Sequence, residues 1–328
     1  MIKILIELLE FLRSCAPLFV SLGIFTLFFV LLSKSIKKHA TVYYTVFAVP
    51  FLLYLIPFTG GLLGFEMFNV VTIPVVGEII RDYIHVGAFA HPILIIIMYI
   101  GALNPKIPAV KKLLSIRKEI SIISGFPILT HSLVRVVNNL PNSFKFFTNK
   151  SEYLENTKVV SELGAGISSF SFLLGVILLI IFIPLWVTSF DWVRKHMSGL
   201  QWKKLQRWSY VLYALLFVHA IGIQVGGMLN PRVAPRPAIE ATASVPVQGR
   251  ESNHGENRQT DRKQPPRNQQ ASNGRAPSKG ISDINVSRQT KQYIHIISLI
   301  LIYSSYLYLR LRKAKKNAVK KSKTEVSA

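Results

Sequence analysis

Residues 208–229 read WSYVLYALLFVHAIGIQVGGML, a stretch without a single Asp, Glu, Lys or Arg. An α-helix rises 1.5 Å per residue, so about 20 residues cross the hydrocarbon core of a bilayer, which is about 30 Å thick. The stretch therefore predicts a transmembrane helix. Its unusual feature is an ionisable side chain, His219, near the middle of the apolar run.

Six further apolar runs of similar length occur in the 328-residue chain, half of whose residues are hydrophobic. The alternating strand and helix periods that are typical of a soluble α/β enzyme are absent from the sequence pattern. We therefore predict an all-α fold, a polytopic bundle of about seven transmembrane helices. The six other runs cover residues 14–33, 42–62, 83–103, 119–137, 165–188 and 293–309.

The formal net charge of +23 is concentrated between the apolar runs, which favours a membrane topology signal over a nucleic-acid interface. Lys and Arg gather after the first, third, fifth and seventh runs, whereas the connections 63–82 and 138–164 carry few of them. By the positive-inside rule the amino terminus lies outside and the carboxyl terminus is cytoplasmic. The four basic segments are residues 33–39, 104–118, 193–207 and 310–323.

One long connection, residues 230–290, is basic although this topology places it outside the membrane. Long loops translocate largely regardless of their charge, so the topology stands. The connection is rich in Pro, Gln, Asn, Ser and Arg and is expected to be disordered. The chain thus divides into two extra amino-terminal spans (1–82), a four-span core (83–229), the loop (230–290), and a final span with a basic tail (291–328).

Five of the eight histidines lie in predicted spans, where ionisable side chains are costly and mark functional sites. Two of them share a depth. His131 lies 12 residues beyond the cytoplasmic end of its span at Glu119, and His219 lies 11 residues beyond Trp208. Both are about 17 Å above the inner boundary. Two imidazoles at one depth on two helices can ligate one haem iron, one on each face; packing histidines or a proton path are the alternatives.

Arg135 follows His131 by four residues, on the same helical face and one turn further out. Its guanidinium could pair with a haem propionate. An unpaired Arg in lipid would cost about 3 kcal/mol, although this close to the outer boundary it could also extend into the interface.

His91 lies at the same depth, 12 residues from the end of its span at Leu103. It is a pocket residue or a third candidate ligand, although the adjacent Pro92 also permits a simple kink with a hydrogen-bonded histidine. His85 and His295 lie near the outer boundary, where a second cofactor between them is an alternative. A different class of function also remains open, a proton-coupled transporter in which His91, His131 and His219 form a protonatable cluster.

A series of short motifs follows one another between residues 84 and 228. The order resembles the ferric reductase-like transmembrane domain and, within it, the haem-binding membrane subunit of the bacterial methionine sulfoxide reductase system, whose pattern runs RRxLGL, LH, PLAxTS, WxxLHRLxY and LHY. The resemblance covers a little under half of the chain and leaves out the first, second and seventh spans. The motifs read HVGAFAHPILIIIMYIGAL, SIRKE, ILTHSLVR, IPLWVTS, WKKLQRWSY and FVH.

The resemblance implies that His131 and His219 are the axial ligands of one haem b in the outer half of the membrane. Related two-haem proteins repeat a histidine 13 or 14 residues away on each ligand helix. This chain has Gln206 before His219, and Arg117 and Lys118 before His131. A single outer haem is therefore expected.

Another carrier is expected in the inner half of the membrane, since an outer haem leaves a long tunnelling distance to the cytoplasm. FMN or a quinone near Arg117, Lys118, Gln206 and Arg207 would serve, because cations hold a flavin phosphate. Contact with lipid phosphates explains each of these cations equally well.

The resemblance further implies an oxidoreductase-class electron-transfer subunit in the plasma (bacterial inner) membrane. Only about 19 residues follow the last span, and they contain no Gly-rich phosphate motif, so a NAD(P)H- or FAD-binding domain is not expected in this chain. Electrons would come from a cytoplasmic flavin reductase or from membrane quinol. The acceptor would be an extracytoplasmic redox protein or ferric iron. A non-catalytic assembly partner that has lost its cofactor is a third possibility.

Overall fold

A computed structural model describes residues 16–65, 73, 87–157, 159–230 and 287–326 of the chain. Over these residues the all-α prediction is confirmed, because they form helices joined by turns and contain no strand. The helices are α2 (Pro17–Leu31), α3 (Ser33–Lys38), α4 (Ala40–Leu62), α6 (Ala90–Ala102), α7 (Pro108–Ser115), α8 (Arg117–Thr148), α9 (Lys150–Asn156), α10 (Glu162–Val187), α11 (Asp191–Arg194), α12 (Gly199–Gln206), α13 (Trp208–Leu229) and α14 (Arg288–Val326).

Within the described residues, five helical segments are long and apolar enough to cross a membrane: α4, α8, α10, α12 with α13, and α14. Two shorter apolar helices, α2 and α6, lie within the predicted runs 14–33 and 83–103. These helices indicate a multi-pass membrane protein. The prediction of seven spans rests on α2 and α6 crossing the membrane as well.

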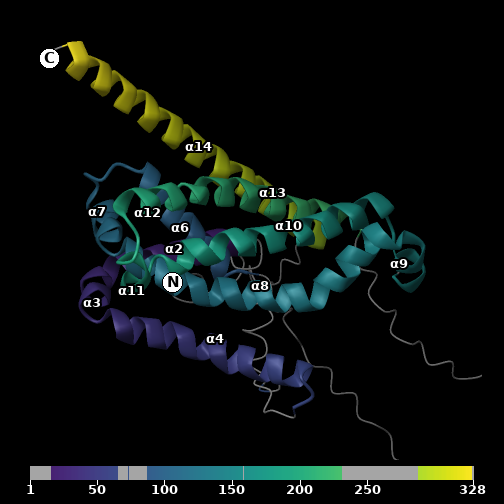
Figure 1. Ribbon diagram of the computed structural model, residues 1–328. Helices are drawn as coiled ribbons and strands as arrows, with labels where there is room; N and C mark the ends of the chain where they lie inside the picture. The colour runs from purple at the N-terminus through teal and green to yellow at the C-terminus, as the bar shows by residue number, and fades with distance from the viewer. Residues whose placement is uncertain (1–15, 66–72, 74–86, 158, 231–286, 327–328) are drawn as a thin grey trace, which may run out of the picture.

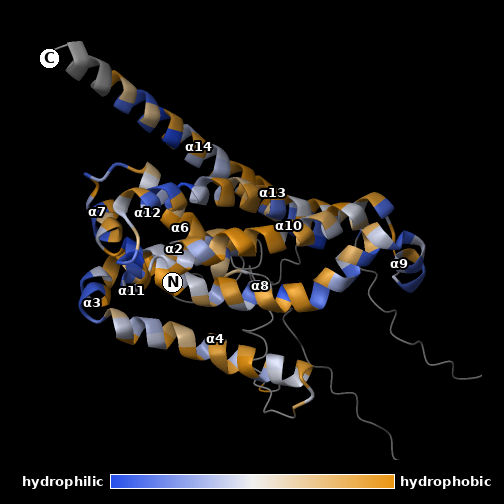
Figure 2. Cartoon of the chain, in the orientation of Figure 1, coloured by the Kyte–Doolittle hydropathy of each residue, from blue (hydrophilic) through white to orange (hydrophobic). Residues whose placement is uncertain are grey.

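The helices lie roughly side by side, and polar residues gather at the two ends of the bundle (Figures 1 and 2). We call these the α7 end, which contains α3, α7, α11 and α12, and the α9 end, which contains α9. Hydrophobic residues dominate the middle of α8, α10 and α13 (Figure 2). This distribution is the one expected of a helix bundle that lies across a bilayer.

Two helices extend beyond the apolar runs that predict them. Within the connection 138–164, α8 continues to Thr148 and α9 follows at once. Phe146 is buried near the end of α8 and packs edge to face against Tyr153 of α9, with ring centroids 5.2 Å apart. The last helix also extends beyond the predicted run 293–309. α14 starts at Arg288, is 39 residues long and ends within the basic tail, where Lys, Arg and Ala favour helix.

The pair α10 and α13 forms a close seam of small residues. A Cβ atom added at Gly222 or Gly226 of α13 would overlap Ser171 or Ser168 of α10. Such small residues let helix backbones approach closely in a membrane. Asn230, just beyond α13, accepts hydrogen bonds from the backbone N–H groups of residues 160 and 161, at 2.7 and 3.3 Å. The seam therefore fixes α13, and with it His219, against α10.

Candidate functional site

A cavity of about 630 Å³ lies between α6, α8, α10, α13 and α14. On α10 it extends from Ala165 to Phe182, which corresponds to about 25 Å along the helix. The part towards the α7 end is lined by apolar side chains, whereas the part towards the α9 end is lined by amides, hydroxyls and cations. A ligand with one apolar and one polar edge therefore matches the cavity. The apolar lining includes Leu94, Ile128, Leu178, Phe182 and Leu212.

His219 projects from α13 into this cavity and is held by α10. Its Nδ1–H donates a hydrogen bond of 2.7 Å to the backbone carbonyl of Ser171. Because a carbonyl only accepts, the proton of a neutral imidazole is on Nδ1, and Nε2 keeps its lone pair. Gly175 makes this approach possible, since a Cβ atom there would lie 3.1 Å from Cε1 of His219. The arrangement is that of an oriented metal-ligating histidine.

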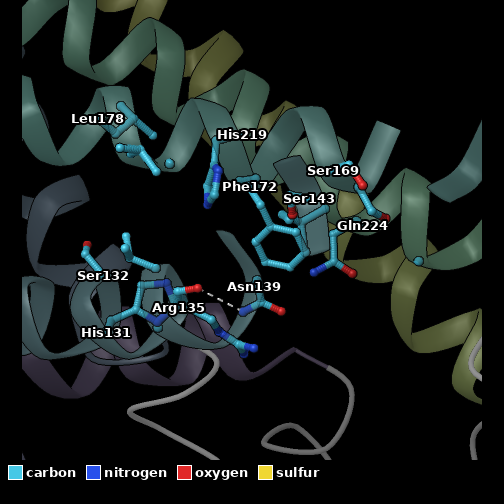
Figure 3. A pocket seen from close by; sticks show the side chains of 18 of the residues that line it. His131, Ser132, Arg135, Asn139, Ser143, Ser169, Phe172, Leu178, His219 and Gln224 are labelled. Atoms are coloured by element: carbon cyan, nitrogen blue, oxygen red, sulfur yellow. Dashed lines mark hydrogen bonds between the residues drawn. The ribbon is translucent and has the colours of Figure 1, made fainter. Parts of the chain in front are cut away.

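His131 projects from α8 into the same cavity, and in Figure 3 its ring lies across the open space from His219. It also rests against a glycine. Gly87, which precedes α6, has a positive φ of 75°, and a Cβ atom there would lie 3.2 Å from Cε1 of His131. Both predicted ligands thus line one cavity from two helices, each beside a glycine of a neighbouring segment.

Arg135 also lines the cavity, one turn from His131 towards the α9 end. Asn139, one turn further along α8, donates a side-chain hydrogen bond of 3.1 Å to the backbone carbonyl of Arg135 (Figure 3). Arg135 is therefore one of the residues that line the polar part of the cavity, the part in which a partner would be needed for an anionic group bound beside the two histidines.

His91 lines the cavity from α6, as predicted for a pocket residue. Its Nε2 shares a hydrogen bond of 3.0 Å with the hydroxyl of Tyr303 on α14. A nitrogen in such a hydrogen bond is less available as a ligand than Nε2 of His219. The geometry therefore favours His91 as a wall residue over His91 as an iron ligand. His85 lies outside the described residues.

The four predicted inner residues do not line this cavity. Gln206 donates side-chain hydrogen bonds to the carbonyl of Leu185 (3.4 Å) and to the hydroxyl of Thr188 (3.3 Å), at the end of α10. Lys118 forms a salt bridge of 2.9 Å with Asp191. Arg117 and Arg207 are exposed at the α7 end.

Between the helices, the α7 half of the bundle is occupied by side chains. A core cluster of Leu178, Phe182, Leu185 and Leu212 lies there with Trp186 packed against it. The Trp186 indole donates a hydrogen bond of 3.0 Å to the carbonyl of Ile122, and it covers Gly125 so closely that a Cβ atom there would overlap it. Side chains therefore fill the space between the helices beside Gln206, and none of the four predicted residues lines the cavity that contains the two histidines.

Sequence reasoning missed three residues of α14 that line the polar part of the cavity: Arg288, Gln292 and His295. Arg288 fell in the segment predicted to be a disordered loop, and His295 was assigned only to an alternative cofactor. These three residues are spaced four and three residues apart, and apolar residues follow on the same face of the helix. This periodicity is the sequence signal that could have identified them as part of one helix face.

The donor set fits a haem better than a bare metal ion. The described residues contain no cluster of three or more His, Cys, Asp or Glu side chains that could hold a metal ion. The cavity instead offers two imidazoles on separate helices, an apolar end and a cationic end. A haem with two histidine ligands would use both imidazoles as axial ligands, the apolar end around its ring and the cationic end for its propionates.

Comparison with known protein families identifies the region that contains this cavity. Residues 87–217 match the family model described as ferric reductase like transmembrane component. No curated protein and no solved structure matches the chain. The match begins at the glycine beside His131 and ends two residues before His219, so that α6, α8, α10 and the first part of α13 fall inside it, whereas the rest of α13 and α14 fall outside. Residues 87–217 of this multi-pass membrane protein are therefore similar to the ferric reductase like transmembrane component, a similarity that suggests a membrane electron-transfer component.

Proposed function

We propose that the chain is a b-type cytochrome that transfers electrons across the plasma membrane. The observation that carries this proposal is the pair His131 and His219, which lie on two helices, line one cavity and are each set against a glycine. The haem, when bound, would supply the one-electron Fe(III)/Fe(II) couple. The resemblance to ferric reductase-like domains supports the same reading, because such domains generally bind haem.

The residues of the chain would hold and tune this cofactor. Nε2 of His219 would bind the iron, because Nδ1 is engaged in the hydrogen bond to the Ser171 carbonyl, and that bond also increases the basicity of the imidazole. His131 would take the opposite face of the ring, and Arg135 would neutralise a propionate. The apolar side chains at the α7 end would exclude water from the ring edge, which together with axial imidazoles influences the reduction potential.

In the proposed topology the α9 end faces outside and the α7 end faces the cytoplasm, because the basic segments cluster at the α7 end. The donor would be a cytoplasmic flavoprotein or membrane quinol. The acceptor would be an extracytoplasmic redox protein or ferric iron, which would approach the polar end of the cavity. An inner FMN or quinone would have to bind at the surface beside Arg117 and Arg207, since apolar side chains occupy the interior of the helix bundle at that level.

A spectrum tests the proposal directly. Protein purified in detergent from cells with adequate haem should show the sharp α and Soret bands of low-spin haem after dithionite is added. His131→Ala and His219→Ala should each abolish the low-spin spectrum. His196→Ala, a change at an exposed position outside the cavity, is the control. Protein without these bands, or His219→Ala with an unchanged spectrum, would contradict the proposal.

The transporter alternative remains, because His91, His131 and His219 do line one cavity. Two observations distinguish it from the cytochrome. A transporter would carry protons in the absence of haem, and it would depend on His91 as much as on the other two histidines. The cytochrome requires haem, and His91→Ala should leave its low-spin bands in place, since Nε2 of His91 is bonded to Tyr303.

A further inference from the structure

The last helix presents a polar face to the cavity at its α9 end. Arg288, Gln292 and His295 are spaced four and three residues apart, so they lie on one side of α14, and all three line the cavity. Leu299 and Ile302, on the continuation of that side, are buried. In a helix that crosses lipid, such a polar stripe is stable only where it faces protein, water or a polar ligand.

Contacts with α6 fix the depth of α14, and these contacts are spread along most of α6. The Tyr303 hydroxyl is bonded to Nε2 of His91, and the Tyr99 hydroxyl donates to the carbonyl of Ile302 at 2.6 Å. Further along, Lys313 donates to the carbonyl of Gly101 at 2.9 Å. These contacts are made by residues that follow the stripe, and they hold the stripe at the α9 end of the cavity.

The stripe also packs against a glycine of α13. A Cβ atom at Gly227 would lie 3.4 Å from the side-chain nitrogen of Gln292, which is an ordinary van der Waals distance, so the amide lies directly against this part of α13. The stripe is therefore in contact with α13 at the α9 end of the cavity.

The charged side chains that line the cavity are all cationic among the described residues. The residues that line the cavity include two guanidinium groups, Arg135 and Arg288, and no Asp or Glu occurs among the described lining residues. The neutral side chains around them are mostly hydrogen-bond donors as well as acceptors, including Asn139, Gln224 and Gln292. Two cations in a partly enclosed, low-dielectric space favour an anionic ligand.

We propose that α14 forms the carboxylate-binding end of the haem site, with Arg288, Gln292 and His295 completing the wall that Arg135 begins. This inference rests on the proposed function. Haem has two ionised carboxylates on one edge, and the polarity of the cavity directs that edge towards the α9 end. Haem retention then depends on a helix that lies outside the matched residues 87–217.

A matched pair of variants tests this proposal. Arg288→Gln removes the cavity cation that α14 contributes, and Lys291→Gln removes one positive charge from the same turn of α14 at a residue that does not line the cavity. We expect Arg288→Gln to release haem to a scavenging globin several-fold faster than wild type. It should also lower the midpoint potential, since a nearby positive charge favours the reduced iron. Lys291→Gln should change neither quantity. Equal behaviour of the two variants would overturn the proposal.

A second measurement separates carboxylate binding from a structural effect of the substitution. The chain is expressed under haem limitation and supplied with haemin or with haemin dimethyl ester, which lacks the carboxylate charges. Wild type should bind haemin at least tenfold more tightly than the ester, and Arg288→Gln should reduce that preference. An unchanged preference in Arg288→Gln would contradict the proposal. If wild type binds neither compound and has no haem, the proposed function itself fails, and this inference fails with it.

Discussion

His219 and Ser171 are joined by a hydrogen bond of 2.7 Å from the imidazole Nδ1 to a backbone carbonyl of the neighbouring helix. The carbonyl is within reach because the residue four positions further along α10 is Gly175, which has no side chain to cover it. The orientation of the His219 imidazole therefore depends on Gly175, which need not contact a bound haem.

Gly175→Val is expected to displace the His219 ring, because even a Cβ atom would lie 3.1 Å from Cε1. The haem content of the purified protein should fall several-fold, and the remaining haem should show high-spin features. Gly23→Val in α2 is the control, since nothing lies within 4 Å of a Cβ atom at that position. The measurement is the haem-to-protein ratio and the dithionite-reduced spectrum. A normal low-spin spectrum in Gly175→Val would show that Gly175 does not position His219.

Gly87→Ala is expected to affect the other proposed ligand. The φ of 75° at Gly87 costs an L-residue about 1–2 kcal/mol, and the new Cβ would also press on His131 at 3.2 Å. Gly64→Ala is a matched control, because Gly64 has a φ of 81° but open space around it. Both variants should lose a similar amount of thermal stability in detergent, whereas only Gly87→Ala should lose haem. Equal haem content in the two variants would exclude a role for Gly87 beyond its backbone conformation.

The sequence predicts the helices well because each predicted run contains enough apolar residues to match the thickness of a bilayer, and that property is local. It also predicts that His131, His219 and His91 share a depth and that Arg135 lies one turn further out, and the structure brings all four to one cavity. Their role in binding haem stays a prediction. The contacts of Gly87 with His131 and of Gly175 with His219 could not be recognised from the sequence, because the two residues of each pair are 44 positions apart.

The polar stripe of α14 was missed for a different reason. Arg288 follows a long segment of Pro, Gln, Asn and Ser, and composition gives no sign of where such a segment ends and a helix begins. The apolar run that predicts α8 ends at residue 137, whereas α8 continues past Pro141 to Thr148, and the buried Ser143 and Phe146 stabilise this extension. Tertiary packing decided both boundaries.

Trp186→Phe is expected to lower the stability of the domain without removing haem. The indole donates to the Ile122 carbonyl at 3.0 Å, and Phe would leave that carbonyl without this donor, at a cost of about 1 kcal/mol. Trp186→Ala should cost about 3–5 kcal/mol, because it leaves a large void over Gly125. Thermal unfolding in detergent measures both changes. Trp192→Phe, at an exposed indole, is the control. Loss of haem from a still folded Trp186→Phe protein would contradict the assignment of Trp186 to the core.

Gln206→His tests whether the chain can bind a second haem in the inner half of the bundle. We expect that it cannot, and that the ratio of haem to protein stays at one. The amide of Gln206 is bonded to Leu185 and Thr188, and the space between the helices at this level is filled by the Trp186 cluster. The partner positions on α8 are Arg117 and Lys118, so a second axial histidine is also missing.

The double variant Lys118→His/Gln206→His separates these two causes, because it supplies both imidazoles and leaves the packing unchanged. Pyridine haemochrome analysis against protein concentration gives the stoichiometry, and redox titration shows whether one or two potentials are present. If the packing around Trp186 excludes the inner haem, the double variant also binds only one haem per protein. A stoichiometry of two in the double variant would mean that only the missing ligands had prevented binding, and that the inner half of this bundle can open for a cofactor.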